Sequence, residues 1–310
     1  MLFIKSGLQT SIQDFGRTGY MHLGVSHSGA MDKTSLSLAN YLVGKPKDSP
    51  ALEITLIGPT IQFLSSMRIA ICGAHFDIYL NNDLIFNNQS VDVVSGDILE
   101  FDQLINGARC YLALSCEINL KKQLNSFSTH VTAKIGGYNN RQIKDGDQLS
   151  VLSVNTTQST KNKSLNSSFS QFYSGKYLLR CVESVESNLF SKVQIHQFLS
   201  TKYKINQQSN RMGIRLDGNK IQISQNIQIT SSGLTLGSIQ ITPNGLPIIS
   251  SVDGQTIGGY PRIANIISTD LSILGQLKAH DTVSFELISC NQASILYKQK
   301  ENWIEAILTN

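Results

Sequence analysis

Residues 252–264 (VDGQTIGGYPRIA) combine side chains that can bind a planar carbonyl or carboxylate group. The glycines let the backbone take φ > 0 or let a ligand approach closely. Pro261 fixes its own φ and restricts the residue before it, so the turn is rigid. Side by side, this turn presents a carboxylate, an amide, a phenol and a guanidinium: Asp253, Gln255, Tyr260 and Arg262. A loop with only a structural role has little need of so many such groups.

A second polar cluster, residues 26–32 (SHSGAMD), leads into an expected helix. The free N–H groups and the positive dipole end of a helix N-terminus suit an anion or an oxyanion. The same residues are also typical of an ordinary helix start capped by Ser28 or Asp32. Ser28 is a candidate nucleophile, but no GxSxG motif surrounds it and the sequence assigns it no His–Asp partners. The chain also lacks GxxxxGKS/T, which excludes a P-loop.

Two more polar clusters each carry an arginine. Residues 13–20 contain Arg17 and are followed by His22, and residues 208–213 contain Arg211. A guanidinium in such a setting either binds a carboxylate or ureido oxygen bidentately or forms a structural ion pair, and the sequence leaves both open. His22 is a candidate general base because an unperturbed imidazole titrates near neutrality, although a lone histidine more often has a simple hydrogen-bonding role.

Composition indicates a soluble cytoplasmic protein with a sizeable core. The 310 residues are enough for one large or two ordinary domains; 41% are hydrophobic and 15% are charged. The net charge of +4 is too diffuse to predict nucleic-acid binding, and neither a membrane span nor a signal peptide is expected. The five cysteines have no zinc-ligand spacing, so we expect buried free thiols, a reducing compartment and no metal.

Most of the chain is expected to form strands. Runs rich in β-branched and aromatic residues, separated by Gly, Asn or Asp, predict strands at 68–72, 76–80, 90–94, 98–101 and 109–114. Residues 81–83 (NND) predict a hairpin turn, since Asn and Asp tolerate the left-handed conformation. Helices are few, and the candidates are residues 32–43, 190–199 and 301–308.

One corner pattern occurs three times, at residues 93–101, 143–151 and 277–285. In each, an aspartate ends a turn and alternating residues then enter a strand. We interpret these residues, Asp97, Asp147 and Asp281, as turn caps and not as catalytic acids. The recurrence favours a barrel or sandwich built from similar corners.

A polar segment divides the chain. Residues 155–170 are rich in Ser, Thr and Asn and have no periodicity, which is typical of a flexible linker or long loop. We therefore expect an N-terminal β subdomain over 1–154, a linker or long loop over 155–172, and a C-terminal β subdomain over 173–310.

Taken together and in this order, the motifs resemble one family of carboxyltransferase subdomains. It includes allophanate hydrolase subunit 2 proteins, the C-terminal part of the urea carboxylase carboxyltransferase domain, the antagonist of the sporulation kinase inhibitor, and the C subunit of bacterial 5-oxoprolinase. The matching segments cover nearly the whole chain: residues 7–32, 38–44, 51–63, 72–76, 107–114, 198–218, 237–249 and 253–264.

The resemblance implies a mainly β, cyclophilin-like fold with two barrel-like subdomains and few short helices. It also implies two partners, which are a sibling B subunit of kinase-inhibitor type and a barrel-type A subunit. In 5-oxoprolinase, such an assembly uses ATP to open 5-oxo-L-proline to L-glutamate. Because this chain has no P-loop, we expect ATP to bind one of the partners or to bind in an unfamiliar way.

The chain departs from the family pattern at three places. Asn210 stands where the family usually has Asp, Arg262 stands where it often has Lys, and residues 182–186 (VESVE) replace a usual Gly-Pro. Loss of a carboxylate beside Arg211 either leaves this guanidinium free for a substrate anion or weakens a reaction that needs the acid.

The clusters and the resemblance together predict one site drawn from both halves of the chain. The residues expected to act in catalysis are Arg17, His22, Asp32, Arg211 and Asp253. Those expected to bind the substrate are Ser28, Gly29, Asn210, Gln255, Gly258, Gly259, Tyr260 and Arg262.

Three functions remain open. The leading one is a hydrolase component of 5-oxoprolinase, inactive without its partners, with a cyclic amide as substrate. The second is half of a biotin-dependent carboxyltransferase acting on a ureido substrate, for which another protein must supply the biotin because no Met-Lys attachment segment occurs here. The third is a non-catalytic regulator that binds a kinase-inhibitor homologue. No nucleic acid or membrane is expected as a partner.

Overall fold

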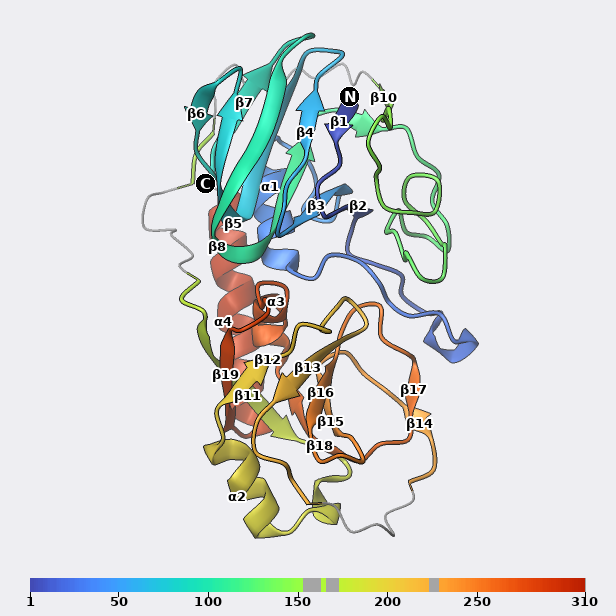
Figure 1. Ribbon diagram of the computed structural model, residues 1–310, viewed down its shortest axis with the longest axis vertical. Coiled ribbons are helices and arrows are strands. Elements are labelled where there is room, and N and C mark those ends of the chain that lie inside the picture. The colour runs from blue at the N-terminus through green and yellow to red at the C-terminus, as the bar shows by residue number, and fades with distance from the viewer. Residues whose placement is uncertain (153–162, 166–172, 223–228, 310) are drawn as a thin grey trace. The chain divides into compact units, whose positions relative to one another are not determined.

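The structure, a computed structural model, describes residues 1–152, 163–165, 173–222 and 229–309 (Figure 1). Most of the expected linker 155–172 lies outside the described residues. The contacts divide the chain into two compact units: Met1–Thr18 with Ser28–Tyr173, and Gly19–His27 with Ser174–Asn310. The short segment Gly19–His27 thus groups with the second unit, whereas the expected N-terminal subdomain, residues 1–154, includes it.

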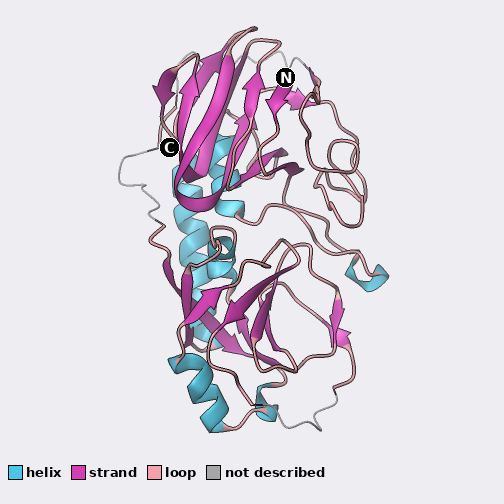
Figure 2. Ribbon diagram, viewed as in Figure 1, coloured by secondary structure: helices cyan, strands magenta, loops and turns pink. Residues whose placement is uncertain are grey.

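The first unit is an antiparallel sheet (Figure 2). Its main path is β1 (Leu2–Lys5), β4 (Thr60–Gln62), β8 (Ile98–Leu114), β3 (Ala51–Thr55) and β2 (Gln9–Gln13). The long strand β5 (Met67–Leu80) pairs with β8 and also with β6 (Asp83–Ile85) and β7 (Ser90–Val93). A separate pair is formed by β9 (Glu117–Ile118) and β10 (Val151–Leu152). Inward-facing aliphatic and aromatic side chains of these strands form one continuous core.

Four of the predicted strands merge into two. Residues 68–72 and 76–80 both lie in β5, and residues 98–101 and 109–114 both lie in β8. The polar and glycine residues between them suggested breaks, but the ladder continues through register shifts between Gly73 and Ile78. The predicted hairpin turn is confirmed, because Asn81 and Asn82 have φ of 51° and 72° and connect β5 to β6.

The first predicted helix is confirmed as α1 (Lys33–Leu42). The side chain of Asp32 caps it by accepting the backbone N–H of Ser35, with 3.0 Å between N and Oδ1. Leu36, Ala39 and Leu42 are buried, and the helix packs against β5 and β8. Packing on these strands fixes where the helix begins, and with it the polar loop before the helix.

The second unit is a closed barrel of seven strands. In order around the barrel they are β11 (Lys176–Glu183), β18 (Arg262–Ile266), β15 (Ser238–Ile241), β16 (Pro247–Ser250), β13 (Gly213–Asp217), β12 (Tyr203–Ile205) and β19 (Thr282–Leu287). The contact of β11 with β19 is parallel and closes the barrel, and the other contacts are antiparallel. A small pair of strands, β14 (Ser232–Gly233) and β17 (Ile257–Gly258), lies outside this ring. The expectation of a mainly β fold with barrel-like subdomains is confirmed.

Helices of the second unit lie outside the barrel ladder. The predicted helix 190–199 is α2 (Lys192–Ser200), with a capping box formed by Ser191 and Gln194, and a short helix α3 spans Leu271–Leu274. The predicted C-terminal helix 301–308 is longer than expected, because α4 spans Cys290–Thr309. Its start has a second capping arrangement: Ser289 N–H donates to Gln292 Oε1 at 2.9 Å, and Gln292 N–H donates to Ser289 Oγ at 3.2 Å. None of the helices in the described ranges is long and apolar enough to cross a membrane.

The three repeated corners have the same hydrogen bonding. Each aspartate carboxylate accepts the backbone N–H three residues earlier: Asp97 that of Val94 at 2.8 Å, Asp147 that of Lys144 at 2.7 Å, and Asp281 that of Lys278 at 3.0 Å. The residue before each aspartate has positive φ, and it is Gly96, Gly146 or His280. The interpretation of these aspartates as turn caps is confirmed.

Replacement of Asp97 by alanine tests the capping role. The carboxylate also accepts Asn81 Nδ2 at 2.7 Å, so Asp97→Ala removes two hydrogen bonds and leaves the Val94 N–H to water. We expect a loss of about 1 kcal/mol in the free energy of unfolding, measured by urea denaturation. Asp102→Ala, at an exposed position of β8, is the matched control. An equal loss in both variants would contradict the capping role.

Candidate functional site

Asp14 joins the polar segment after β2 to a loop far along the sequence. Its carboxylate accepts four hydrogen bonds: from Gly16 N at 2.8 Å, Ser126 Oγ at 2.6 Å, Phe127 N at 2.6 Å, and Ser128 Oγ. Its own carbonyl accepts Ala30 N–H at 2.9 Å. Since the residue is buried, these bonds replace the water that the charge would otherwise need. Asp14 therefore fixes the shape of this end of the first unit.

Around Asp14, the first unit brings together residues predicted from two separate clusters. Arg17 is buried, and its Nη2 donates to the carbonyl of Ser128. Ser28 Oγ donates to the carbonyl of Thr129 at 3.3 Å. Ser28 and Gly29 have φ of 56° and 91°, and a side chain on Gly29 would meet the backbone of Gly16 within 3 Å. Glycine is required there because two backbone segments touch.

Residues 126–129 (SFST) bind the side chains described above, but they were not identified as part of a site from the sequence. Its hydroxyl and carbonyl groups bind Asp14, Arg17 and Ser28. The adjacent glycines Gly136 and Gly137 could have indicated from the sequence that the backbone comes close to other groups in this region. Both glycines have positive φ, and a side chain on Gly136 would collide with the Arg17 guanidinium and the Ser128 carbonyl.

Asp32, which was predicted to act in catalysis, makes several hydrogen bonds that support the fold. Besides Ser35 N–H, its carboxylate accepts Ser35 Oγ at 2.7 Å, and its own N–H donates to Tyr111 Oη at 2.7 Å. Tyr111 in turn donates to Glu53 Oε2 at 2.7 Å. Burial, and then the charge of Glu53, raise the pKa of Tyr111 well above its usual value, so the phenol stays protonated and donates. Two residues, Ser28 and Asp32, were candidates for the N-cap of α1, and the N-cap is Asp32.

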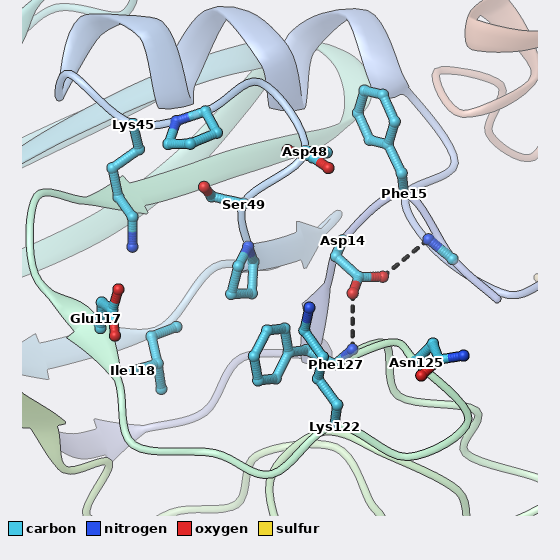
Figure 3. Close-up of a pocket in the computed structure, with 13 residues that line it drawn as sticks. Asp14, Phe15, Lys45, Asp48, Ser49, Glu117, Ile118, Lys122, Asn125 and Phe127 are labelled. Atoms are coloured by element: carbon cyan, nitrogen blue, oxygen red, sulfur yellow. Dashed lines mark hydrogen bonds between the residues drawn. The ribbon is translucent and has the colours of Figure 1, made fainter.

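A pocket opens beside the Asp14 cluster, within the first unit (Figure 3). Its volume is about 410 Å³. Its lining is a mixture of apolar side chains, two lysines and three carboxylates, with the charged groups being Asp14, Lys45, Asp48, Glu117 and Lys122. The charges of both signs in one cavity favour ligands that carry both signs.

In the second unit, Arg211 and Asp253 form a buried ion pair. Arg211 Nε donates to Oδ2 at 2.8 Å and Nη2 donates to Oδ1 at 3.1 Å, and the two side chains are 4% and 5% exposed. Asp253 N–H also donates to the Arg211 carbonyl at 2.8 Å, which extends the pairing of β13 with β16 beyond the strand ends. Arg211 is thus not left free by the presence of Asn210, because its carboxylate partner comes from residues 252–264.

Arg262 forms an ion pair with Glu186, which lies in the segment 182–186. Its Nε donates to Glu186 Oε2 at 3.0 Å and its Nη2 to Glu186 Oε1, while its backbone N–H also reaches Oε2 at 3.0 Å. The remaining donors bind Gly233 O at 2.5 Å and Ser232 Oγ at 2.7 Å. Arg262 and Glu186 are therefore a matched pair that ties β14 and residue 186 to barrel strand β18.

The remaining predicted residues of the second unit are closer to solvent. The side chain of Asn210 accepts Met212 N–H at 2.8 Å, a turn contact that an aspartate would also make. Gln255 and Gly259 are exposed, Gly258 is half-buried, and Tyr260 is 43% exposed. His22 is exposed in the middle of the 3-10 turn Met21–Leu23.

Chemically, the second unit offers hydrogen-bond donors and acceptors on a rigid frame. The two arginines are bound inside by Asp253 and Glu186, whereas the amide of Gln255 and the phenol of Tyr260 reach solvent. Among the described residues no cluster of three or more His, Cys, Asp or Glu side chains is arranged to hold a metal ion. Cys72, Cys110, Cys116 and Cys181 are buried free thiols and Cys290 is exposed.

Glu186→Gln tests whether the Arg262 pair supports the barrel. The hydrogen bonds from Arg262 lower the pKa of Glu186 below its usual value. A depressed carboxyl pKa stabilises the fold above the unfolded-state pKa and loses this effect as pH falls through the folded-state pKa. We therefore expect Glu186→Gln to reduce the free energy of unfolding by about 1–2 kcal/mol at pH 7 and by less near pH 3–4.

Urea denaturation at both pH values measures the effect. Glu183→Gln is the matched control, since Glu183 is exposed on the neighbouring strand β11. A Glu186→Gln effect that is equal at both pH values, or no larger than that of the control, would contradict a stabilising ion pair.

Comparison with known proteins gives consistent matches along the chain. The family described as carboxyltransferase domain, subdomain A and B, matches residues 23–287. The C subunit of 5-oxoprolinase from Haemophilus influenzae is 33% identical over 99% of this chain and 96% of its own length. The protein of the same name from Escherichia coli is 32% identical over 98% of this chain and 96% of its own length.

Solved structures agree with the sequence matches. The crystal structure of the K. lactis urea amidolyase has a TM-score of 0.93 at 32% identity, and covers 99% of this chain. The match occupies only 20% of that longer chain. The K. lactis urea carboxylase gives a TM-score of 0.92 at 32% identity, over 98% of this chain and 29% of its own. The chain belongs to the carboxyltransferase domain family, subdomains A and B.

Proposed function

We propose that the chain is a component of an ATP-dependent 5-oxoprolinase, which cleaves 5-oxo-L-proline to L-glutamate together with partner subunits. The observation that carries the proposal is the match to two proteins named as the C subunit of 5-oxoprolinase, each over 96% of its own length. A full-length match at this identity supports the same place in an assembly, whereas a shared fold alone would not support a function.

In this proposal the predicted residues divide into groups that contact the substrate and groups that position them. Gln255, Tyr260 and the backbone at Gly258–Gly259 bind the lactam carbonyl or carboxylate, because they lie at or near the surface. Asp253 with Arg211, and Arg262 with Glu186, hold this loop in place. Asn210 shapes the turn before Arg211.

The catalytic candidates near the start of the chain divide in the same way. His22 is exposed and is the candidate that can exchange protons with a substrate. Arg17 and Asp32 are buried and engaged, and Ser28 and Gly29 are buried with them, so we assign these four to positioning. Their contribution is the rigid backbone of the first unit.

ATP does not suit the pocket described above in the first unit. The pocket of the first unit carries three carboxylates against two ammonium groups, which opposes a triphosphate, and no P-loop occurs in the sequence. We therefore assign ATP binding to the partners, a barrel-type A subunit and a sibling B subunit of kinase-inhibitor type, in a cytoplasmic hetero-oligomer. The free cysteines of the chain are compatible with a reducing compartment.

A second candidate function is half of a biotin-dependent carboxyltransferase. The similarity to the K. lactis urea carboxylase and urea amidolyase favours it. Carboxybiotin and urea have planar ureido and carboxylate groups, which the same donors would recognise. A carrier protein would have to bring the biotin. A third candidate, a regulator without turnover, requires only that the chain bind its sibling.

One assay separates the three functions. The chain is co-purified with its sibling and barrel-type partners, and glutamate release from 5-oxoproline is measured with ATP. We expect release that depends on all chains and that is unchanged by avidin. Inhibition by avidin, together with urea-dependent ATP hydrolysis, would replace the proposal with the carboxyltransferase. Tight sibling binding without turnover would replace it with the regulator.

Tyr260→Phe tests the assignment of the substrate-binding loop. Removing one hydroxyl that donates to a substrate carboxylate or carbonyl should lower kcat/KM about tenfold or more and leave folding intact, because the side chain is exposed. Steady-state kinetics of the complex measure the change. Tyr297→Phe on α4 is the matched control, since Tyr297 is exposed to a similar degree. An unchanged kcat/KM in the Tyr260 variant would remove this residue from the site.

A further inference from the structure

The pocket beside the Asp14 cluster is built from three separate segments of the first unit. They are the residues after β2, the loop 45–50 that follows α1, and residues 117–127 around and beyond β9 (Figure 3). None of the residues predicted as a site from the sequence lines it. Its volume of about 410 Å³ lies within the range typical of small-molecule sites.

The walls of this pocket are fixed before any ligand binds. Asn40 Nδ2 donates to the carbonyls of Lys47 at 3.3 Å and Ser49 at 2.8 Å, which holds the loop after α1. Asp14 holds Phe127 and Gly16 through their backbone N–H groups, as the dashed lines in Figure 3 indicate. A preformed cavity avoids the entropy that ordering loops around a ligand would cost.

Two ammonium groups point into the pocket from different walls. Lys45 Nζ donates to the Cys116 carbonyl at 3.0 Å, which leaves two of its three N–H groups for a ligand. Burial lowers the pKa of Lys45, and the negative charge of Glu117 opposes this shift. Lys122 Nζ lies 5.3 Å from the centre of the Phe127 ring, which orients it toward the cavity.

Two carboxylates of the lining complement these cations. The carboxylates of Asp48 and Glu117 make no hydrogen bond or ion pair to any residue in the described part of the chain, whereas the carboxylate of Asp14 is already satisfied by its four donors. Glu117 lies opposite the end of Lys45 in Figure 3. The pocket therefore has acceptors available for a cation as well as donors available for anions.

We propose that this pocket binds an acidic α-amino acid in its zwitterionic form. The two carboxylates of the ligand bind Lys45 and Lys122, and its ammonium group binds Glu117, which lies near the end of Lys45 in Figure 3. The short methylene chain lies against the apolar part of the lining, which includes Ile118 and Phe127. A polyphosphate does not suit a lining with three carboxylates, and a neutral apolar ligand would offer no acceptor to the remaining N–H groups of the two lysines.

If the chain is part of a 5-oxoprolinase, this pocket distinguishes the product, L-glutamate, from the substrate, 5-oxo-L-proline. This consequence rests on the proposed function. L-Glutamate has an ammonium group, whereas the nitrogen of 5-oxoproline is an amide and carries no charge. The binding proposal itself depends only on the pocket.

Isothermal titration calorimetry of the full chain, without partners, tests the proposal. The probes are L-glutamate, glutarate, which lacks the ammonium group, and 5-oxo-L-proline, which lacks the charged nitrogen. We expect L-glutamate to bind about tenfold or more tightly than either comparator, because each lost charge-assisted hydrogen bond weakens binding by about this factor. This measurement involves no turnover, so its failure is distinct from failure of the proposed function.

Single substitutions locate the binding. Lys45→Met and Lys122→Met should each weaken L-glutamate binding about tenfold, while the matched control Lys47→Met, whose side chain does not line the pocket, should bind as the wild type. Glu117→Gln, at an exposed position, should weaken L-glutamate but not glutarate, and it keeps the test valid where loss of the Lys45 contact with Cys116 harms folding. Thermal unfolding monitors the fold of each variant.

Three outcomes would overturn the proposal. One is equal affinity for L-glutamate and glutarate, which would mean that the ammonium group is not recognised. Another is L-glutamate binding that survives both the lysine substitutions and Glu117→Gln, which would place the ligand elsewhere. The third is no heat of binding for wild-type protein with L-glutamate at millimolar concentration.

Discussion

The carboxylate of Asp14 is the interaction on which the functional end of the first unit depends. It is buried, and it is satisfied by two backbone N–H groups and two serine hydroxyls. Loss of any one donor would leave a charge short of a partner in a medium of low dielectric. The four bonds therefore fix together the residues after β2 and a loop more than a hundred residues later, and both Arg17 and Ser28 take their positions from that loop.

In the second unit, two bidentate arginine–carboxylate pairs hold separate segments of the chain together. Arg211 and Asp253 join the loops that extend β13 and β16, while Arg262 and Glu186 join β18 to the segment after β11. The guanidinium of Arg262 has more donors than an ammonium group, and Glu186 supplies the carboxylate that these donors need.

Local patterns made much of the fold predictable. Alternation and turn residues predicted the strands, Asn81–Asn82 the hairpin, and the repeated aspartates the three corners, because each of these depends on neighbours in sequence. Pairing over long distances was not accessible in this way. The continuity of β5 and β8 across polar residues, and the role of residues 126–129, arise from contacts between segments far apart in the chain. The sequence singled out Arg211, Asp253 and Arg262, but only the structure reveals that each has a carboxylate or guanidinium partner.

The parallel pairing of β11 with β19 has a consequence for how the protein is made. These are the first and last strands of the barrel in the sequence, with Lys176 opposite Thr282 and Cys181 opposite Leu287. A ribosome therefore completes the sheet of the first unit long before the barrel can close, and the nascent barrel keeps two unpaired strand edges until its final strand emerges. The segment Gly19–His27 is translated well before Ser174–Asn310, the rest of the unit with which it groups. A segment that is translated long before the residues it packs against stays exposed in the meantime, and such a segment is where a chaperone can assist folding.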